Sequence, residues 1–264
     1  MGVNSLPWYY IEVLDDQPGN AVLAGEEWHH ALHVLRMNIG ESLLLFDGKG
    51  KAFEGILQKS TKTQGTIELI ADRSSDFQPA SACHINIAFA PTKSPDRTET
   101  AIEKIVELGV DSITFLDCKN GERSHIRMDR IRKIIISAAK QSRKLYLPVI
   151  NDFISPLHLV QNFEIENPKS AIQNSKSQIQ NLKSKIVCCH PDAEALPLHD
   201  TYQGEENVVV LIGPEGGFAA DEIAELKSMN IPMTTLGPHR LRVETAVISA
   251  CANIHLLYAL KNNR

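Results

Sequence analysis

Short stretches in which apolar and polar residues alternate fill the first 75 positions of the chain. Three of them, residues 42–46, 51–57 and 66–70, are separated by Asp47-Gly48-Lys49-Gly50 and by Gln64-Gly65. Evenly spaced short strands with glycine-containing turns predict a small β-barrel.

The pattern changes after a linker rich in Ser, Asp and Pro at about residues 72–82. Apolar runs then alternate with stretches of helical periodicity, at residues 85–90, 97–108, 113–116 and 130–145. Strands that alternate with helices are typical of a mainly parallel sheet. We therefore predict an α/β domain over residues 76–264 behind a barrel domain over residues 1–75.

A glycine-rich loop follows a buried strand near the C-terminus. Residues 208–212 are continuously apolar and β-branched, which predicts a strand covered on both faces, and residues 220–229 predict a helix. Three glycines between them would let the backbone turn sharply and approach a ligand. The spacing is neither that of a dinucleotide fingerprint nor that of a phosphate-binding P-loop. Taken alone, the loop is better explained as an ordinary tight turn.

A second loop of the same kind follows residues 233–236, another strand candidate, and opens with Gly237-Pro238. Arg242 and Glu244 precede a helix that starts at about residue 245. This helix carries a wide apolar surface suited to burial, including burial against another subunit: Val247, Ile248, Cys251, Ile254, Leu257 and Tyr258. Ligands of open α/β sheets bind outside the carboxyl ends of the strands. The two loops therefore predict one small-molecule site.

The composition is that of an ordinary globular protein, with 43% hydrophobic and 22% charged residues. The net charge of −5 is unusual for a protein that binds RNA, but the charges are unevenly distributed. Nine lysines and arginines and only two acids fall between Lys119 and Lys144. Such a one-signed stretch could follow a phosphate backbone, although a solvated helix face is the common alternative.

The remaining chemistry of the sequence points away from metals, disulfides and membranes. Five cysteines without CxxC spacing indicate a reducing compartment, and adjacent Cys188 and Cys189 are expected in the core. His29 and His33 have metal-binding spacing but lack an evident third ligand, so we expect no metal. No apolar run reaches transmembrane length, and no signal peptide is evident. We expect a cytoplasmic protein.

The two C-terminal loops, in their order along the chain, resemble the RsmE family of 16S ribosomal RNA uridine methyltransferases in the SPOUT superfamily. The resemblance covers nearly the whole chain and rests on these two long motifs and on four further segments. They are His30-x-x-x-Val34-Leu35-Arg36 with Gly40, Glu103-Lys104-x-x-Glu107-Leu108-Gly109-Val110, Glu122-Arg123-Ser124, Ala138-Ala139-Lys140-Gln141-Ser142-Arg143, Ile212-Gly213-Pro214-Glu215-Gly216-Gly217-Phe218, and Leu236-Gly237-x-x-x-Leu241-Arg242-x-Glu244-Thr245-Ala246.

The resemblance implies a PUA-like barrel that helps to hold RNA, a C-terminal trefoil knot in the α/β domain, and a homodimer. It also implies methyl transfer from S-adenosylmethionine to N3 of a uridine in 16S rRNA. The base must be exposed before the enzyme can reach it, so we expect the assembled small ribosomal subunit as substrate.

The residues expected at the cofactor lie in the two loops and at the end of a third strand: Leu211, Ile212, Gly213, Pro214, Glu215, Gly216, Gly217, His190, Leu236, Gly237, Leu241, Arg242, Thr245 and Ala246. Those expected at RNA lie in the barrel and in the basic stretch: His30, Arg36, Arg123, Arg130, Lys133, Lys140, Arg143 and Lys144.

Three residues are the catalytic candidates. The acceptor is an imide N–H, which becomes a better nucleophile when it loses its proton, so a base or a stabilising cation would help. Arg242 is the candidate for positioning or charge stabilisation, whereas Glu215 and Glu244 are acid/base candidates that could instead hold a loop.

Two other readings of the function stay open. The chain could methylate another RNA as a knotted methyltransferase, or it could be an RNA-binding module without turnover; a nucleotide-dependent oxidoreductase is disfavoured by the glycine spacing.

One segment departs from the family. Residues 169–186 repeat Lys-Ser-x-Ile-Gln-Asn with a period of seven, which predicts a polar surface insertion.

Overall fold

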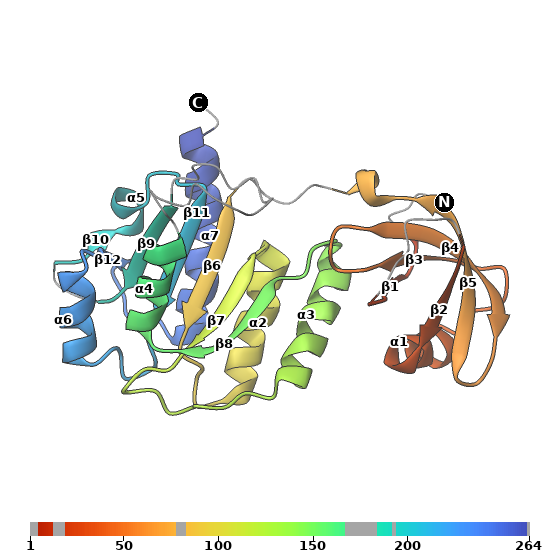
Figure 1. The fold of residues 1–264 in the computed structure, drawn as a ribbon, viewed down its shortest axis with the longest axis horizontal. Coiled ribbons are helices and arrows are strands. Elements are labelled where there is room, and N and C mark those ends of the chain that lie inside the picture. Colours follow the sequence, from red (N-terminus) through yellow and green to blue (C-terminus); the bar gives the residue numbers. More distant parts are fainter. Residues whose placement is uncertain (1–4, 13–18, 78–82, 167–183, 192–193, 263–264) are drawn as a thin grey trace. The chain divides into compact units, whose positions relative to one another are not determined.

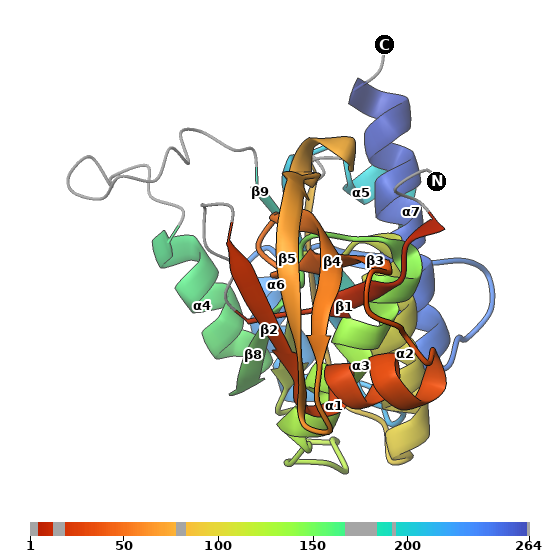
Figure 2. The ribbon, with the colours of Figure 1, turned by 90° about the vertical axis from the view of Figure 1, so that its right-hand side faces the viewer.

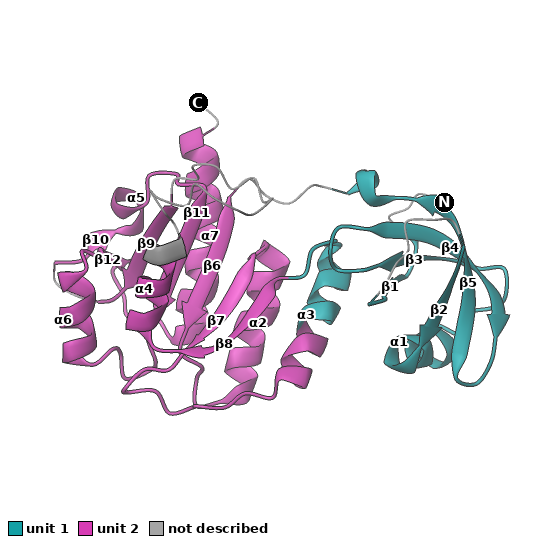
Figure 3. Ribbon diagram, in the orientation of Figure 1, with its two compact units in different colours: residues 1–80, 135–147 teal, residues 81–134, 148–264 magenta. Residues whose placement is uncertain are grey.

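The computed structural model describes residues 5–12, 19–77, 83–166, 184–191 and 194–262. The chain divides into two compact units, which Figure 3 distinguishes by colour. Unit 1 comprises residues 1–80 and 135–147, and unit 2 comprises residues 81–134 and 148–264.

Unit 1 is built on a five-stranded sheet in the order β1-β3-β4-β5-β2. Its strands are β1 (Trp8–Tyr10), β2 (Asn20–Ala24), β3 (Ser42–Phe46), β4 (Ala52–Ser60) and β5 (Gln64–Asp72). Strands β1 and β3 pair in parallel and the other pairs are antiparallel. Figure 2 shows β2, β5 and β4 side by side, with the sheet curled. The three strands predicted in this region are confirmed.

Alternation of side chains explains why this sheet encloses a core. Leu43 and Leu45 of β3, Leu57 of β4 and Ile67 of β5 all point inward. Trp28 packs against them from the short helix α1 (Gly25–His29), which continues into a π-helical turn, η2 (His30–Val34). A short 3-10 turn, η3 (Ser74–Asp76), follows β5.

The basic helix, α3 (Met128–Ser142), contributes residues to both units, since residues from 135 onward belong to unit 1. Within unit 1, Lys140 forms an ion pair with Glu27 at 2.6 Å, and the Arg143 guanidinium lies over the Trp8 ring at 5.7 Å from its centroid. Lys49 forms an isolated antiparallel bridge with Tyr146. The end of this helix therefore packs within unit 1, against its curled sheet and α1.

Unit 2 contains a seven-stranded sheet in the order β10-β12-β9-β11-β6-β7-β8, and every pairing in it is parallel (Figure 1). Its strands are β6 (His84–Phe89), β7 (Ser112–Leu116), β8 (Val149–Ile154), β9 (Ser184–Cys189), β10 (Leu196–Pro197), β11 (Asn207–Ile212) and β12 (Met233–Thr235). The predicted parallel α/β domain is confirmed.

Helices cover both faces of this sheet: α2 (Pro95–Leu108), α4 (Pro156–Glu166), α5 (Leu198–Thr201), α6 (Ala220–Ser228) and α7 (Val243–Asn262), with the first half of α3. Helix α7 packs against α2, β6 and β11, whereas α4 packs against α6. Val209 and Leu211 of β11 face the cluster that contains Val160 of α4 and Leu226 of α6. The intervening residues of β11 face the opposite side, which explains its uninterrupted apolar sequence.

Helix α7 corrects one expectation, because by length and composition it could cross a membrane. Ser249, Asn253 and His255 interrupt its apolar residues, so no continuous run reveals it in the sequence. A single helix of this kind is weak evidence for a membrane span. In this structure its buried side, which includes Val247 and Ile254, packs into the α/β domain.

The predicted insertion at residues 169–186 lies outside the described residues up to position 183. Its last part differs from expectation, since residues 184–186 already belong to strand β9. Ile186 of this strand is buried in the same cluster as Val209 and Leu211.

Candidate functional site

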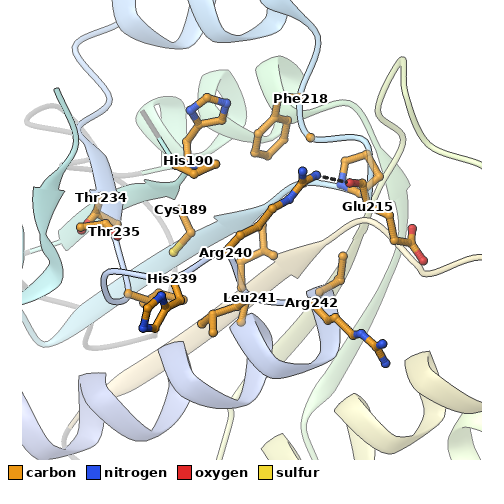
Figure 4. Close-up of a pocket in the computed structure, with 18 of the residues that line it drawn as sticks. Cys189, His190, Glu215, Phe218, Thr234, Thr235, His239, Arg240, Leu241 and Arg242 are labelled. Carbon is orange, nitrogen blue, oxygen red and sulfur yellow. Dashed lines mark hydrogen bonds between the residues drawn. The ribbon is translucent and has the colours of Figure 1, made fainter. Parts of the chain in front are cut away.

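A pocket of about 430 Å³ opens at the carboxyl ends of β9, β11 and β12. Parallel pairing of these strands brings their following loops to one edge of the sheet. Figure 4 shows labelled residues from all three loops turned towards a common space. The lining comprises Arg97, Cys189, His190, Pro191, Ile212, Gly213, Pro214, Glu215, Gly217, Phe218, Thr234, Thr235, Leu236, His239, Arg240, Leu241, Arg242, Val243 and Ala246.

The loop after β11 needs its glycines for two different reasons. Gly217 has φ +76°, a conformation that side chains disfavour. At Gly213, a Cβ would lie 3.0 Å from the buried Phe218 ring and 3.1 Å from the Phe218 amide nitrogen. The loop therefore folds tightly around Phe218 and leaves its backbone exposed towards the pocket.

Glu215 connects this loop to two others. Its carboxylate accepts a hydrogen bond from the Lys93 backbone N–H at 3.0 Å, in the loop after β6. Its backbone carbonyl accepts one from the Arg240 guanidinium at 2.8 Å, in the loop after β12 (Figure 4). One residue thus holds the loops of three strands together.

A buried carboxylate holds the loop after β7 in the same region. Glu222 of α6 accepts hydrogen bonds from the backbone N–H groups of Ala219 at 2.7 Å and Lys119 at 3.0 Å. The Asn120 amide donates to the Gly217 carbonyl at 3.1 Å. The loop after β7 is therefore fixed against the glycine loop.

Strand β12 is held in register below the pocket by buried hydroxyl groups. The Thr234 and Thr201 hydroxyls hydrogen-bond at 3.0 Å, and Thr234 also donates to the Leu196 carbonyl at 3.0 Å. The His190 backbone N–H donates to the Thr234 carbonyl at 3.0 Å, which joins the ends of β9 and β12. These contacts set the floor on which the second loop rests.

The three catalytic candidates lie close to this pocket in different environments. Arg242 is exposed and lines the pocket, and its side chain points in a different direction from that of Arg240 (Figure 4). Glu244 lies outside the lining and faces Arg97 at 3.8 Å, with its side chain only 16% exposed. Glu215 is exposed, and one of its carboxylate oxygens is engaged by Lys93.

Ten of the residues expected at the cofactor line the pocket: His190, Ile212, Gly213, Pro214, Glu215, Gly217, Leu236, Leu241, Arg242 and Ala246. The structure places the other four beside the lining: Leu211, Gly216, Gly237 and Thr245. Leu211 is fully buried and turned into the core, because neighbouring residues of a strand face opposite sides.

Several lining residues are absent from the sequence-based expectation. Cys189, expected in the core, is only partly buried and lines the pocket, and burial raises the pKa of its thiol to about 12. Phe218, His239 and Arg240 fall inside the recognised motifs and could have been included. Arg97 arrives from α2, and only the strand order, with β6 beside β11, brings it here.

The residues expected at RNA are spread over both units. In unit 1, Arg36 is exposed with φ +52°, and His30 lies edge-on to Tyr9. Of the basic stretch, Lys140 and Arg143 are engaged within unit 1 as described above. In unit 2, Arg130 forms two hydrogen bonds to Glu99, at 2.5 and 2.6 Å. The exposed Lys133 and half-buried Lys144 complete the set, with Arg123 near the pocket.

Among the residues that the structure describes, no group of three or more His, Cys, Asp or Glu side chains could hold a metal ion. His29 and His33 do stack, with ring centroids 4.6 Å apart, but they lack a third ligand there.

Comparison with known proteins defines the class to which this fold and site belong. The family model of the RNA methyltransferase domain matches residues 79–255, and that of the RNA methyltransferase PUA domain matches residues 23–70. The protein is thus an RNA methyltransferase of the type that carries an N-terminal PUA domain.

Similar proteins narrow this class further. A probable rRNA methyltransferase from Porphyromonas gingivalis is 31% identical, with a TM-score of 0.80 over 97% of this chain and 99% of that one. A ribosomal RNA small subunit methyltransferase E from Neisseria gonorrhoeae, bound to S-adenosylmethionine, is 25% identical, with a TM-score of 0.80 over 96% and 98%. The Mycobacterium tuberculosis methyltransferase E is 28% identical over 94% of this chain and 91% of its own length. The chain belongs to the RsmE family of the SPOUT superfamily.

Proposed function

We propose that the protein transfers a methyl group from S-adenosylmethionine to N3 of a uridine in the 16S rRNA of the small ribosomal subunit. The observation that carries the proposal is the pocket at the carboxyl ends of β9, β11 and β12. Both of its principal loops bear the family's long motifs, and the related Neisseria gonorrhoeae enzyme binds S-adenosylmethionine.

The pocket suits this cofactor in size and chemistry. Its volume of about 430 Å³ lies within the range of small-molecule sites. Backbone groups of Gly213 and Leu236 offer hydrogen bonds to a nucleoside, while Ile212 and Leu241 offer apolar contact. The bound cofactor would supply a methyl group already activated on a sulfonium centre.

The chain's own residues would then position and activate the acceptor nitrogen. Arg242, exposed at the pocket, is placed to stabilise the negative charge of a deprotonated imide. Glu244, beside Arg97, remains an acid/base candidate. Glu215 is better suited to holding loops than to moving a proton, because one of its carboxylate oxygens accepts the Lys93 N–H.

RNA recognition is assigned to both units. His30 and Arg36 would present the PUA-like unit to RNA, and Arg123 would do so near the pocket. The engagement of Arg130 and Lys140 by carboxylates argues against a continuous phosphate track along α3.

A homodimer in the cytoplasm completes the proposal. Leu256 and Leu260 of α7 are 56% and 57% exposed although the opposite side of this helix is buried. A second copy of the chain would cover them, as expected for a trefoil-knotted methyltransferase with its cofactor sites near the knots.

The test is labelled methyl transfer from S-adenosylmethionine to small ribosomal subunits that lack the modification, mapped by nuclease digestion and mass spectrometry. A single N3-methyluridine in 16S rRNA supports the proposal. Label in another RNA, or at another base atom, would contradict the substrate assignment. Cofactor binding without any transfer would point to another RNA target, whereas failure to bind the cofactor would favour the RNA-binding module.

A further inference from the structure

Two arginines beside the pocket are held by backbone carbonyls. The Arg123 Nε donates to the Lys93 carbonyl at 3.1 Å, and the Arg240 Nη2 donates to the Glu215 carbonyl at 2.8 Å. The Lys93 N–H in turn donates to the Glu215 carboxylate at 3.0 Å. Both guanidinium groups are thus anchored to two residues that are themselves joined, at the junction of the loops after β6, β7, β11 and β12.

The kind of anchor distinguishes these two arginines from Arg130 and Lys140 of the basic stretch. A carbonyl oxygen carries no formal charge, so it fixes the direction of a guanidinium and leaves its positive charge in place. Arg130 and Lys140, by contrast, contact the carboxylates of Glu99 and Glu27. The ammonium of Lys93 is also compensated, since Glu122 lies 2.9 Å from it and raises its pKa.

We infer that Arg123 and Arg240, here called the arginine pair, bind backbone phosphates of the RNA next to the target nucleotide. This inference rests on the proposed function and assigns RNA contacts to the mouth of the pocket. A guanidinium with one N–H used by a carbonyl retains four others in a fixed fork, which matches phosphate geometry. A pre-oriented cation also loses less side-chain freedom on binding.

The two members differ in what else they can touch. Arg240 lines the pocket, so its loss would also affect the cofactor, whereas Arg123 lies outside the lining. Arg123 therefore gives the clean test. Its replacement should weaken RNA binding and leave the affinity for S-adenosylmethionine unchanged.

The experiment measures the affinity of the full chain for unmodified small ribosomal subunits over a range of salt concentrations. For Arg123→Ala and for Arg240→Ala, we expect roughly tenfold weaker binding, as for a lost charge-assisted hydrogen bond. The slope of log K against log salt should become shallower by about 0.7–0.9 for each arginine. Arg123→Lys should restore the slope but only part of the affinity.

The matched control is Lys227→Ala, which removes one positive charge at the far end of α6. It should bind like the unmodified chain. Equal slopes and affinities in Arg123→Ala and this control would overturn the inference, as would a loss confined to cofactor affinity in Arg123→Ala. Melting temperatures of the variants identify a folding defect. If Arg123→Ala is destabilised, the salt slope and the affinity of Arg123→Lys test the inference in its place.

Failure of the inference can be told apart from failure of the proposed function. Methyl transfer by the unmodified chain is measured on the same subunits. Methyl transfer by the unmodified chain, together with unchanged RNA affinity and salt slope in the variants, would refute only the phosphate contacts of the arginine pair. Absence of methyl transfer would refute the proposed activity, and the salt slopes would still test the phosphate contacts.

Discussion

Two adjacent glycines in the loop after β11 would respond differently to a side chain. Gly217 has φ +76° and open space where a Cβ would lie, so its requirement is conformational. At Gly216, a Cβ would make ordinary contact with Asn120 at 3.5 Å, and its φ is not positive. The sequence shows three glycines there, and only the backbone geometry separates their roles.

Gly217→Ala should therefore lower the free energy of unfolding by about 1–2 kcal/mol, the cost of placing an L-residue in a left-handed conformation. Gly216→Ala is the neighbouring control and should change it by less than about 0.5 kcal/mol. Urea denaturation of both variants measures the difference. Equal effects would show that the loop conformation is wrong.

Glu215 offers a test that separates loop holding from acid/base catalysis. Glu215→Gln keeps an oxygen that can accept the Lys93 N–H, so we expect most turnover to be retained. Glu215→Ala removes the acceptor and should reduce turnover and cofactor affinity together. Rates of methyl transfer measured with saturating cofactor decide between loop holding and acid/base catalysis. Turnover abolished by Gln as completely as by Ala would support proton transfer instead.

At the scale of elements, the periodicity of the sequence predicts the helices and strands well. The contacts that their side chains make depend on residues that are distant in the sequence. Helical spacing in α3 correctly predicts a basic face, but it gives no sign of Glu27 or Glu99, which lie 113 and 31 positions away from their partners. The pocket loops were predictable because each motif is contiguous. Arg97 was not, because sequence does not reveal that β6 lies beside β11.

Lys140→Met tests whether the end of α3 stabilises unit 1. The side chains of Lys140 and Glu27 are 21% and 20% exposed, and the ammonium nitrogen lies 2.6 Å from a carboxylate oxygen. Loss of the ammonium would leave a largely buried carboxylate without this ion pair. We expect the free energy of unfolding to fall by about 1–2 kcal/mol. Arg127→Met at an exposed position just before α3 is the control. A double-mutant cycle of Lys140→Met with Glu27→Gln should show coupling in the free energy of unfolding. Purely additive losses of stability would contradict a direct interaction between the two side chains.

For the whole molecule, the change of pattern along the chain predicts domains over residues 1–75 and 76–264, whereas the compact units have other bounds, since residues 135–147 belong to unit 1. Strand alternation with short turns indicated the curled sheet, and the alternation of strands with helices indicated the parallel one. The order of the strands, and the assignment of residues 135–147 to unit 1, depend on contacts between residues that are distant in the sequence. Local patterns cannot specify such contacts.

Buried thiols make the stability of unit 2 sensitive to high pH. Burial raises the pKa of Cys118, of Cys188 and of Cys189, the last to about 12. Unfolded thiols ionise near pH 8.5, so above that pH the unfolded state binds fewer protons than the folded state. The free energy of unfolding should then fall by up to about 1.4 kcal/mol per pH unit for each thiol. Denaturation between pH 8 and 10.5 measures it, and Cys188→Ala should show a shallower fall; identical slopes would contradict this account.

The proposed dimer predicts that the exposed side of α7 controls assembly. Leu256→Glu combined with Leu260→Glu should yield a folded monomer in sedimentation experiments, because carboxylates would be desolvated at the interface. Val149→Glu, at a residue of β8 that is 62% exposed, serves as the control and should leave assembly unchanged. A monomeric unmodified chain would contradict the dimer itself.

The most direct measurement is a calorimetric titration of the protein with S-adenosylmethionine, made in parallel on a variant whose pocket is filled. Ala246 lines the pocket from the first turn of α7, so Ala246→Trp should abolish binding. Ala224→Trp, at an exposed position on α6, should bind like the unmodified chain. Saturable binding in the unmodified chain and the control, lost only in Ala246→Trp, is the result that the account predicts. Binding that survives in folded Ala246→Trp, or no binding by the unmodified chain, would contradict it.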